Sequence, residues 1–192
     1  MLNKQIYALC DFELLQNHNL SLVDYLRKIN KQNLVYVQYR DKVNPIKTQM
    51  RNLKCLMENI DVPVIINDKL ELLELADGLH FGQEDLLEIS NKFKLSKENM
   101  IKLIRKKYQN KILGLSTHNE LEILEANNLD LDYIGLGAYR STNTKDVNNI
   151  LRDNISYLAK ISKHPVGAIG GVKLDDEIKN ISYYVIGSGL IK

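Results

Sequence analysis

Two acidic residues follow short apolar runs in this sequence, close to the places where buried strands would end. Asp68 comes just after the run at 64–66, and Asp85 comes shortly after the run at 78–81. Magnesium ions in proteins are usually held by one or two carboxylates, with water and phosphate oxygens as the other ligands. No cluster of cysteine and histidine suggests zinc instead. The two acids therefore predict a Mg²⁺ site with Asp68 and Asp85 as its protein ligands.

Basic residues and glycine turns follow other apolar runs in the same way. The basic residues are Arg40, Lys42 and Lys145, and the glycine turns are Gly170-Gly171 and Gly187-Ser188-Gly189. An arginine can hold a phosphate group through two parallel hydrogen bonds, whereas a lysine acts as a point charge. Glycine turns can expose backbone N–H groups to a second phosphate. We expect chemistry on a diphosphate, with a second phosphorylated ligand nearby.

Each of these positions also has a purely structural interpretation. Asp68 and Asp85 could each cap the helix that follows, which is a common use of aspartate. His80 lies inside an apolar run, where a packed and hydrogen-bonded core residue is the better interpretation. Similar interpretations exist for a helix start at His118, a tight turn at Gly187 and Gly189, and loop residues at Thr142 and Thr144. The two acids and three basic residues taken together favour ligand binding.

Short apolar runs alternate with helical patterns along the whole chain, and these elements must position the residues above. The predicted strands lie near Gln5–Cys10, Leu34–Tyr39, Val62–Ile66, Gly78–Phe81, Ile112–Leu115, Tyr133–Leu136, Pro165–Ile169 and Tyr183–Ile186. Several are apolar at nearly every residue, which is typical of parallel strands covered on both faces. Eight strands alternating with helices predict an α/β fold, a (β/α)₈ TIM barrel, with ligands at the C-terminal ends of the strands. A doubly wound sheet is disfavoured because no Gly-x-Gly-x-x-Gly follows the first strand.

Apolar spacing of three and four residues marks the helices between these strands. The predicted helical segments are Leu22–Ile29, Thr48–Asn59, Lys69–Leu75, part of Lys97–Lys107, Asn119–Ala126 and Val147–Ile161. The long segment Leu86–Lys111 holds one or two helices, and its role is open. The chain ends a few residues past the eighth strand, so the barrel has a shortened C-terminal end. A second copy that covers this end, in a homodimer, would replace the missing helix.

Length and composition describe an ordinary globular chain. At 192 residues we expect one domain over 1–192. A net charge of +2, without a concentrated basic face, predicts no nucleic-acid partner. No apolar run approaches the ~18 residues that span a bilayer, so no membrane association is expected. No export signal is visible, and Cys10 and Cys55 lack the spacing of a metal or redox pair, so we expect a cytoplasmic protein.

Six stretches, read in order, resemble the thiamine phosphate synthase family, part of a superfamily that includes the TenI proteins. They are VQYRDK (Val37–Lys42), VIIND (Val64–Asp68), ADGLHFGQED (Ala76–Asp85), ILGLSTHN (Ile112–Asn119), DYIGLGAYRSTNTK (Asp132–Lys145) and PVGAIGGV (Pro165–Val172). The resemblance implies a transferase on a (β/α)₈ barrel. It would couple hydroxymethylpyrimidine diphosphate to hydroxyethylthiazole phosphate with Mg²⁺, giving thiamine phosphate and pyrophosphate.

The resemblance also assigns roles to residues at matching positions. Those implied for the pyrimidine diphosphate are Gln38, Arg40, Lys42, Asn67, Ser116 and Lys145, of which Arg40, Lys42, Ser116 and Lys145 are expected to be catalytic. Those implied for the thiazole phosphate are Thr142, Thr144, Gly171, Gly187 and Ser188. Tyr39, Asp41 and Asn143 lie within the matching stretches and are also expected to contact substrate. Asp68 and Asp85 would bind Mg²⁺.

The implied reaction is dissociative: pyrophosphate leaves, and the thiazole nitrogen captures a carbocation stabilised by the pyrimidine. Such chemistry needs no strong protein base, and no nucleophile–base pair is evident in the sequence. Departures from the family pattern are Asp41 in place of glutamate, the segment 138–142, Gly187 in place of an apolar residue, the long 86–111 segment and the absent closing helix. These departures affect mainly the thiazole-phosphate half of the site.

Two other functions are considered. A TenI-type thiazole tautomerase would use the same barrel, with His118 as a proton carrier. It would not require two acids beside Lys42 and Lys145, because its reaction has no diphosphate leaving group. A non-catalytic binder of thiamine-pathway phosphates is the second alternative, motivated by the short C-terminus and by Gly187.

Overall fold

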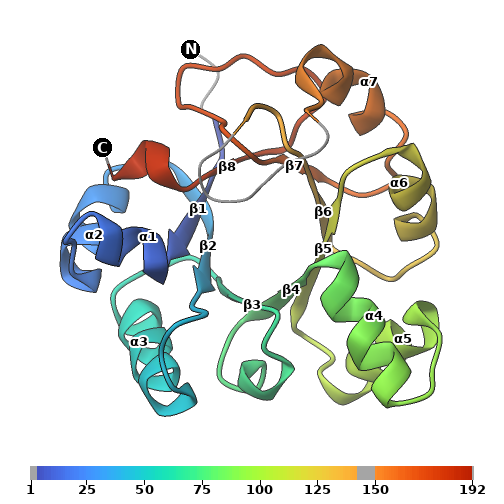
Figure 1. Cartoon of the computed structure of the whole chain (residues 1–192), viewed down its shortest axis with the longest axis horizontal. Coiled ribbons are helices and arrows are strands. Elements are labelled where there is room, and N and C mark those ends of the chain that lie inside the picture. The colour runs from blue at the N-terminus through green and yellow to red at the C-terminus, as the bar shows by residue number, and fades with distance from the viewer. Residues whose placement is uncertain (1–3, 142–149, 192) are drawn as a thin grey trace.

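Eight parallel strands close into a barrel in the computed structural model, which describes residues 4–141 and 150–191. The strands are β1 (Ile6–Asp11), β2 (Leu34–Arg40), β3 (Val64–Asn67), β4 (Gly78–Phe81), β5 (Ile112–Thr117), β6 (Tyr133–Leu136), β7 (Val166–Ala168) and β8 (Tyr183–Ile186). Each strand pairs with the next in sequence, and β8 pairs with β1. Figure 1 shows this ring with the helices outside it. The predicted (β/α)₈ fold is confirmed.

Helices cover the outside of most of the ring. They are α1 (Phe12–Asn17), α2 (Leu22–Ile29), α3 (Ile46–Glu58), α4 (Gln83–Lys92), α5 (Lys97–Lys107), α6 (Glu120–Ala126) and α7 (Ile155–Ala159), with 3₁₀ turns η1 (Leu70–Leu72), η2 (Arg152–Asn154) and η3 (Ser188–Leu190). Side-chain caps begin several of them: Ser21 forms a capping box with Asp24 at α2, and Ser96 accepts a hydrogen bond from the Asn99 N–H at α5.

Some helical segments differ from the prediction. The expected helix at Lys69–Leu75 is only the turn η1. Of the expected helix Val147–Ile161, the described residues form η2 and the short helix α7. The long segment Leu86–Lys111 contains most of α4 and all of α5. The helix α1 was not predicted. It begins directly after β1, where the Asp11 carboxylate accepts a hydrogen bond from the Leu14 N–H.

The barrel interior is filled by large side chains that face glycines. Tyr7, Ile65, Tyr133 and Val185 form the buried centre of this cluster, which is separate from the larger core between the strands and the helices. A Cβ atom on Gly114 would lie 2.2 Å from the Tyr133 ring. The glycine in β5 therefore makes room for the tyrosine from β6.

The C-terminal end of the chain covers β8 without a final helix. Tyr184 and Ile186 of β8 are buried in the same core cluster as Ile178, Leu190 and Ile191, and the Tyr184 hydroxyl accepts a hydrogen bond from the Ile178 N–H at 3.1 Å. The residues that precede and follow β8 therefore pack against this strand. Within the described residues, no helix is both long enough and apolar enough to cross a membrane.

Candidate active site

The acid pair lies where β3 and β4 end. Asp68 has a left-handed backbone (φ 60°), and its Oδ1 accepts a hydrogen bond from the Gly82 N–H at 3.1 Å. A Cβ atom on Gly82 would lie 2.4 Å from Asp85 Oδ2 and 4.0 Å from Asp68 Oδ1. The two carboxylates thus lie near the same glycine, and the absence of a side chain there makes room for the Asp85 carboxylate.

Neither acid caps a helix in the way that the structural interpretation requires. Lys69 is the cap of η1, and Gly82 is the cap of α4, which places Asp85 at the third position of that helix. Burial raises the pKa of Asp68, and the charge of Asp85 raises it further. Two carboxylates that disfavour each other's charge are a favourable setting for a bound cation.

The donor set fits a magnesium ion. Among residues 4–141 and 150–191, no group of three or more His, Cys, Asp and Glu side chains could enclose a metal. Two carboxylates would therefore leave several positions for water and phosphate oxygens, which is the arrangement that Mg²⁺ prefers. Zinc would require nitrogen or sulfur ligands that this site lacks.

Amide and basic side chains surround the acid pair. Gln38 donates from Nε2 to Asn67 Oδ1 at 3.2 Å, and Asn67 donates in turn to Asp68 Oδ2. Lys42 lies with its Nζ 3.9 Å from Asp68 Oδ2, and its side chain is 54% exposed. Hydrogen bonds and one ion pair therefore connect four of the predicted residues, which come from β2, β3 and the loops that follow them.

Arg40 forms an ion pair with Asp11, a residue that the sequence analysis did not select. Asp11 is buried at the end of β1 and also caps α1. Its Oδ2 pairs with Nη1 of Arg40 at the ends of the neighbouring strands β1 and β2. The same rule that found Asp68, an acid following an apolar run, would have found Asp11 had it been applied to the first strand.

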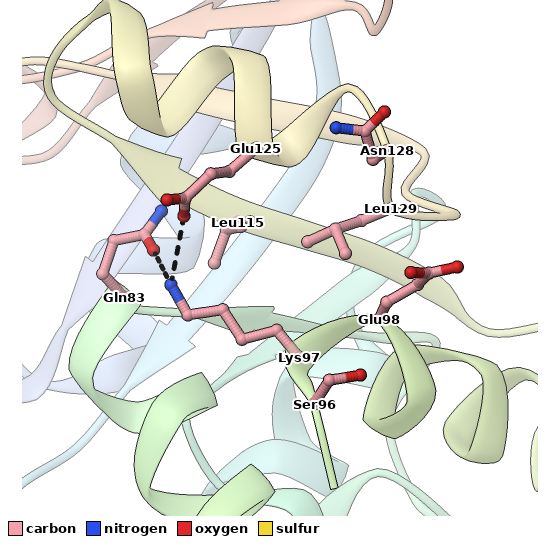
Figure 2. Close-up of a pocket in the computed structure, with 8 residues that line it drawn as sticks. All are labelled: Gln83, Ser96, Lys97, Glu98, Leu115, Glu125, Asn128 and Leu129. Atoms are coloured by element: carbon pink, nitrogen blue, oxygen red, sulfur yellow. Dashed lines mark hydrogen bonds and ion pairs between the residues drawn. The ribbon is translucent and has the colours of Figure 1, made fainter.

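Ser116 is anchored by its hydroxyl and by its carbonyl. Its Oγ lies 2.9 Å from His80 Nε2, and its backbone oxygen accepts a hydrogen bond from Gln83 Nε2 at 2.7 Å. Figure 2 shows Gln83 bonded to Lys97, whose Nζ also lies 3.5 Å from Glu125 Oε2, at a cavity of about 250 Å³. The backbone of Ser116 is thus tied to α4 and α5 outside the barrel.

The contact between Ser116 and His80 has the geometry of a nucleophile–base pair, which the sequence did not reveal. Burial lowers the pKa of His80 to about 4, however, so its imidazole is neutral and weakly basic. Its other nitrogen, Nδ1, lies 2.9 Å from the hydroxyl of Tyr133 and not beside a carboxylate. His80 is a buried, hydrogen-bonded residue, as its position in an apolar run suggested.

Tyr39 and Asp41, which were expected to contact substrate, are bonded to each other. Both are buried, and the Tyr39 hydroxyl donates to Asp41 Oδ2 at 2.6 Å. Asp41 also accepts hydrogen bonds from the N–H groups of Val43 and Asn44. Alternate residues of β2 point to opposite faces, so Gln38 and Arg40 point into the barrel while Tyr39 points outward.

The second half of the expected site lies at the ends of β6, β7 and β8. Gly170 and Gly171 have positive φ values of 86° and 70°. Arg140 donates to the Gly171 carbonyl and forms a two-pronged ion pair with Asp176, which joins the end of β6 to the loop after β7. Gly187 and Ser188 follow β8. Thr142, Asn143, Thr144 and Lys145 lie outside the described residues.

His118, the expected proton carrier of a tautomerase, contacts the start of α6. It follows β5, and its Nδ1 lies 2.9 Å from Glu122 Oε2 at the start of α6. This contact suits a helix-start residue, which was its structural interpretation.

Comparison with known proteins adds an independent finding. The family model described as thiamine monophosphate synthase matches residues 6–183. Two curated proteins named thiamine-phosphate synthase are similar: one from Lawsonia intracellularis is 32% identical over 90% of this chain and 76% of its own length. The other, from Picrophilus torridus, is 30% identical over 81% of this chain and 72% of its own length.

Solved structures share the fold. A thiamine phosphate pyrophosphorylase from Pyrococcus furiosus superposes with a TM-score of 0.71 at 21% identity, over 97% of this chain and 86% of that one. An orotidine 5'-monophosphate decarboxylase from Methanocaldococcus jannaschii gives a TM-score of 0.61 at 14% identity, over 96% of this chain and 90% of that one. At these identities the likeness concerns the barrel and not the chemistry.

Proposed function

The chain belongs to the thiamine monophosphate synthase family, and from this premise we propose how its residues divide between two substrates. The protein is a transferase that couples hydroxymethylpyrimidine diphosphate to hydroxyethylthiazole phosphate, giving thiamine phosphate and pyrophosphate. One observation supports the assignment of residues to the two substrates: Asp68 and Asp85 both lie near Gly82. The Gln38–Asn67 pair and Lys42 lie beside Asp68.

The diphosphate occupies the half of the site built by β2, β3, β4 and β5. Asp68 and Asp85 would hold Mg²⁺, which when bound neutralises the charge that develops on departing pyrophosphate. Lys42 supplies a mobile positive charge, because more than half of its side chain is exposed. Arg40 supplies a positioned one, because one of its guanidinium nitrogens is paired with Asp11. Ser116 offers a hydroxyl whose position is set by His80 and Gln83.

The chemistry asks these residues to bind and orient, not to remove a proton. A departing diphosphate is stabilised by preorganised positive charge and hydrogen-bond donors. The pyrimidine carbocation is then captured by the thiazole nitrogen, which already carries the electron pair that forms the new bond. His80, with its lowered pKa of about 4, suits this division because it is a poor base at neutral pH.

The thiazole phosphate occupies the other half, at the ends of β6 to β8. Gly171 and the Gly187-Ser188 pair would present backbone N–H groups and one hydroxyl to it. Thr142, Asn143, Thr144 and Lys145 complete this proposal from the sequence. A single domain over 1–192, a cytoplasmic location and a homodimer stay predictions.

The test is an assay with both substrates. Purified protein with Mg²⁺ should release pyrophosphate and form thiamine phosphate, and leaving out either substrate or adding EDTA should stop both. Lys42→Met should slow turnover, whereas Lys47→Met, on the exposed face of α3, should not. If no thiamine phosphate forms at any Mg²⁺ concentration, the proposal is contradicted. Turnover of a thiazole carboxylate phosphate that survives EDTA would point to the tautomerase instead.

A further inference from the structure

A line of hydrogen bonds crosses the barrel interior and ends at Ser116. It runs from the Tyr7 hydroxyl to the Tyr133 hydroxyl (2.7 Å), from there to His80 Nδ1 (2.9 Å), and from His80 Nε2 to Ser116 Oγ (2.9 Å). The four side chains come from β1, β6, β4 and β5; β4, β5 and β6 are neighbours, and β1 lies on the other side of the ring in Figure 1. The line connects the closed centre of the barrel with its open end.

The packing shows that the line has a fixed place in the barrel. Tyr133 fills the space that a side chain on Gly114 would need, and a Cβ atom on Gly135 would lie 3.3 Å from His80 Cε1. The imidazole is stacked on the Tyr133 ring, with 5.5 Å between centroids and 21° between planes. Two glycines, in β5 and β6, thus leave the space that these two rings occupy.

The need to place every hydroxyl proton on an acceptor decides which group donates in each of these hydrogen bonds. Tyr7 is 1% exposed, and within the described part of the chain its hydroxyl hydrogen-bonds to Tyr133. If Nδ1 of His80 carried the proton, it would donate to Tyr133, and Tyr133 would donate to Tyr7. The Tyr7 proton would then be buried without a described acceptor, which is costly. The opposite direction satisfies every group: Tyr7 donates to Tyr133, and Tyr133 donates to Nδ1.

We propose that His80 is a positioning residue that donates from Nε2–H to Ser116 Oγ, so that the Ser116 O–H points to the substrate and donates to the departing diphosphate. The ligand in this proposal rests on the proposed function; the proton arrangement does not. A neutral imidazole with its proton on Nε2 can only donate to Ser116. It therefore raises the donor strength of the serine hydroxyl, since hydrogen bonds in a chain polarise one another.

The arrangement differs from a catalytic serine–histidine pair in one testable respect. A general base would accept the Ser116 proton at Nε2 and would need Nδ1–H held by an acceptor such as a carboxylate. Here Nδ1 accepts a hydrogen bond from the Tyr133 hydroxyl. The proton of the neutral imidazole is therefore on Nε2, which donates. Ser116 is then a hydrogen-bond donor to substrate and not a nucleophile.

The tautomer can be measured without any substrate. The chain has four histidines, so ¹⁵N-histidine labelling of the protein at neutral pH resolves few signals, and His80→Gln identifies the one that belongs to His80. We expect that signal to show a protonated Nε2 and an unprotonated Nδ1. A protonated Nδ1 would overturn the proposal. Tyr133→Phe removes the donor to Nδ1 and should produce a mixture of tautomers, whereas Tyr36→Phe should not.

Kinetics test the consequence for Ser116. His80→Phe keeps the ring but removes both nitrogens, and we expect kcat to fall about tenfold or more with KM little changed. His80→Gln, which retains an N–H donor, should recover part of the loss. Tyr133→Phe should reduce kcat less than His80→Phe, and Tyr7→Phe least, because Tyr133 can still donate to Nδ1. Tyr36→Phe is the control: its ring stacks on Tyr133, and its hydroxyl hydrogen-bonds to Tyr183.

A double-mutant cycle separates positioning from general damage to the fold. In a Ser116→Ala background, His80→Phe should cause no further loss of kcat, because the group it positions is gone. Equal losses in both backgrounds would overturn the proposal. Melting temperatures identify variants that fail to fold, in which case His80→Gln and Tyr133→Phe carry the cycle. An inactive wild type with the Nε2–H tautomer would contradict the proposed function and leave the proton arrangement standing.

Discussion

At the scale of single residues, Asp85 is the most informative side chain of the acid pair. Both oxygens of Asp68 accept hydrogen bonds, one from the Asn67 side chain and one from the Gly82 N–H. In Asp68→Asn, the new NH₂ group would face one of these two donors. Asp85 lies in the first turn of α4 without serving as its cap. Changing Asp85 therefore alters charge with little effect on local bonding.

We expect Asp85→Asn to reduce Mg²⁺-dependent turnover at least tenfold and to raise the Mg²⁺ concentration needed for half-maximal rate. The amide keeps the shape but loses the charge that Mg²⁺ requires. The metal-free variant should melt no lower than wild type, because the like charge that opposes ionisation of Asp68 has gone. Calorimetric melting with and without Mg²⁺ measures this directly, since a ligand that binds only the folded state raises stability.

Glu84→Gln is the matched control for this change. Glu84 is the neighbouring acid in the same turn of α4 and is exposed. It should leave both turnover and the Mg²⁺-induced rise in melting temperature unchanged. Equal behaviour of Asp85→Asn and Glu84→Gln would remove Asp85 from the metal site.

At the scale of elements, the Arg140–Asp176 pair joins two segments that the barrel itself does not connect. Both guanidinium Nη atoms lie 2.6 Å from oxygens of Asp176, a carboxylate that also accepts from the Lys173 N–H. Arg140 in addition packs 4.4 Å from the centre of the Tyr139 ring. The pair holds the end of β6 against the loop between β7 and β8, beside Gly171.

Arg140→Lys should lower the free energy of unfolding by about 1 kcal/mol, because lysine cannot reproduce the fork and solvent screens the partly exposed arginine. Arg27→Lys provides the control, since the Arg27–Asp24 contact on α2 is a single exposed one at 3.3 Å. Urea denaturation of both variants gives the comparison. A loss for Arg27→Lys as large as that for Arg140→Lys would show that the fork is not what matters.

The same pair predicts a pH dependence. The hydrogen bonds from Arg140 hold the pKa of Asp176 below its usual value of 3.8. The folded state thus binds this proton less tightly than the unfolded state, so the stabilisation is present above the usual pKa and is lost as pH falls through the lowered one. The stability difference between wild type and Asp176→Asn should be constant from pH 7 to about pH 5 and shrink below the usual value. A difference that grows on acidification would contradict the assignment.

At the scale of the whole molecule, the chain closes its barrel with coil and a 3₁₀ turn where another helix would be expected. Leu190 and Ile191 are only 7% and 5% exposed, although they are among the last residues of the chain. They pack in the core with Tyr184 and Ile186 of β8. The face that a second copy was expected to cover is therefore covered from within.

Leu190→Ala should cost about 2–5 kcal/mol of folding free energy, as is usual when a buried leucine is truncated. Leu121→Ala is the control, because Leu121 on α6 is 74% exposed and should cost far less. Urea unfolding monitored by circular dichroism distinguishes the two. If Leu190→Ala proves as mild as Leu121→Ala, the C-terminal turn does not close the barrel in solution.

The sequence by itself determined the barrel. Short runs such as 64–66, apolar at nearly every residue and alternating with helical patterns, are typical of parallel strands covered on both faces. Parallel strands bring all their C-terminal ends to one side, so residues that follow them, such as Asp68, Lys42 and Ser116, gather there irrespective of their separation in the chain. The local sequence pattern was sufficient to predict which residues lie close together, because the barrel brings the C-terminal ends of all its strands to one side.

Only the tertiary structure decided what each side chain faces. Side chains alternate along β2, so Gln38 and Arg40 bond to Asn67 and Asp11, whereas Tyr39 bonds to Asp41. The Asp11–Arg40 pair joins the ends of two neighbouring strands, and the Tyr7–Tyr133–His80–Ser116 line joins β1 to β6, β4 and β5 through the barrel interior. Periodicity along one strand carries no information about which residues of distant strands meet in the barrel interior, so packing had to decide those contacts.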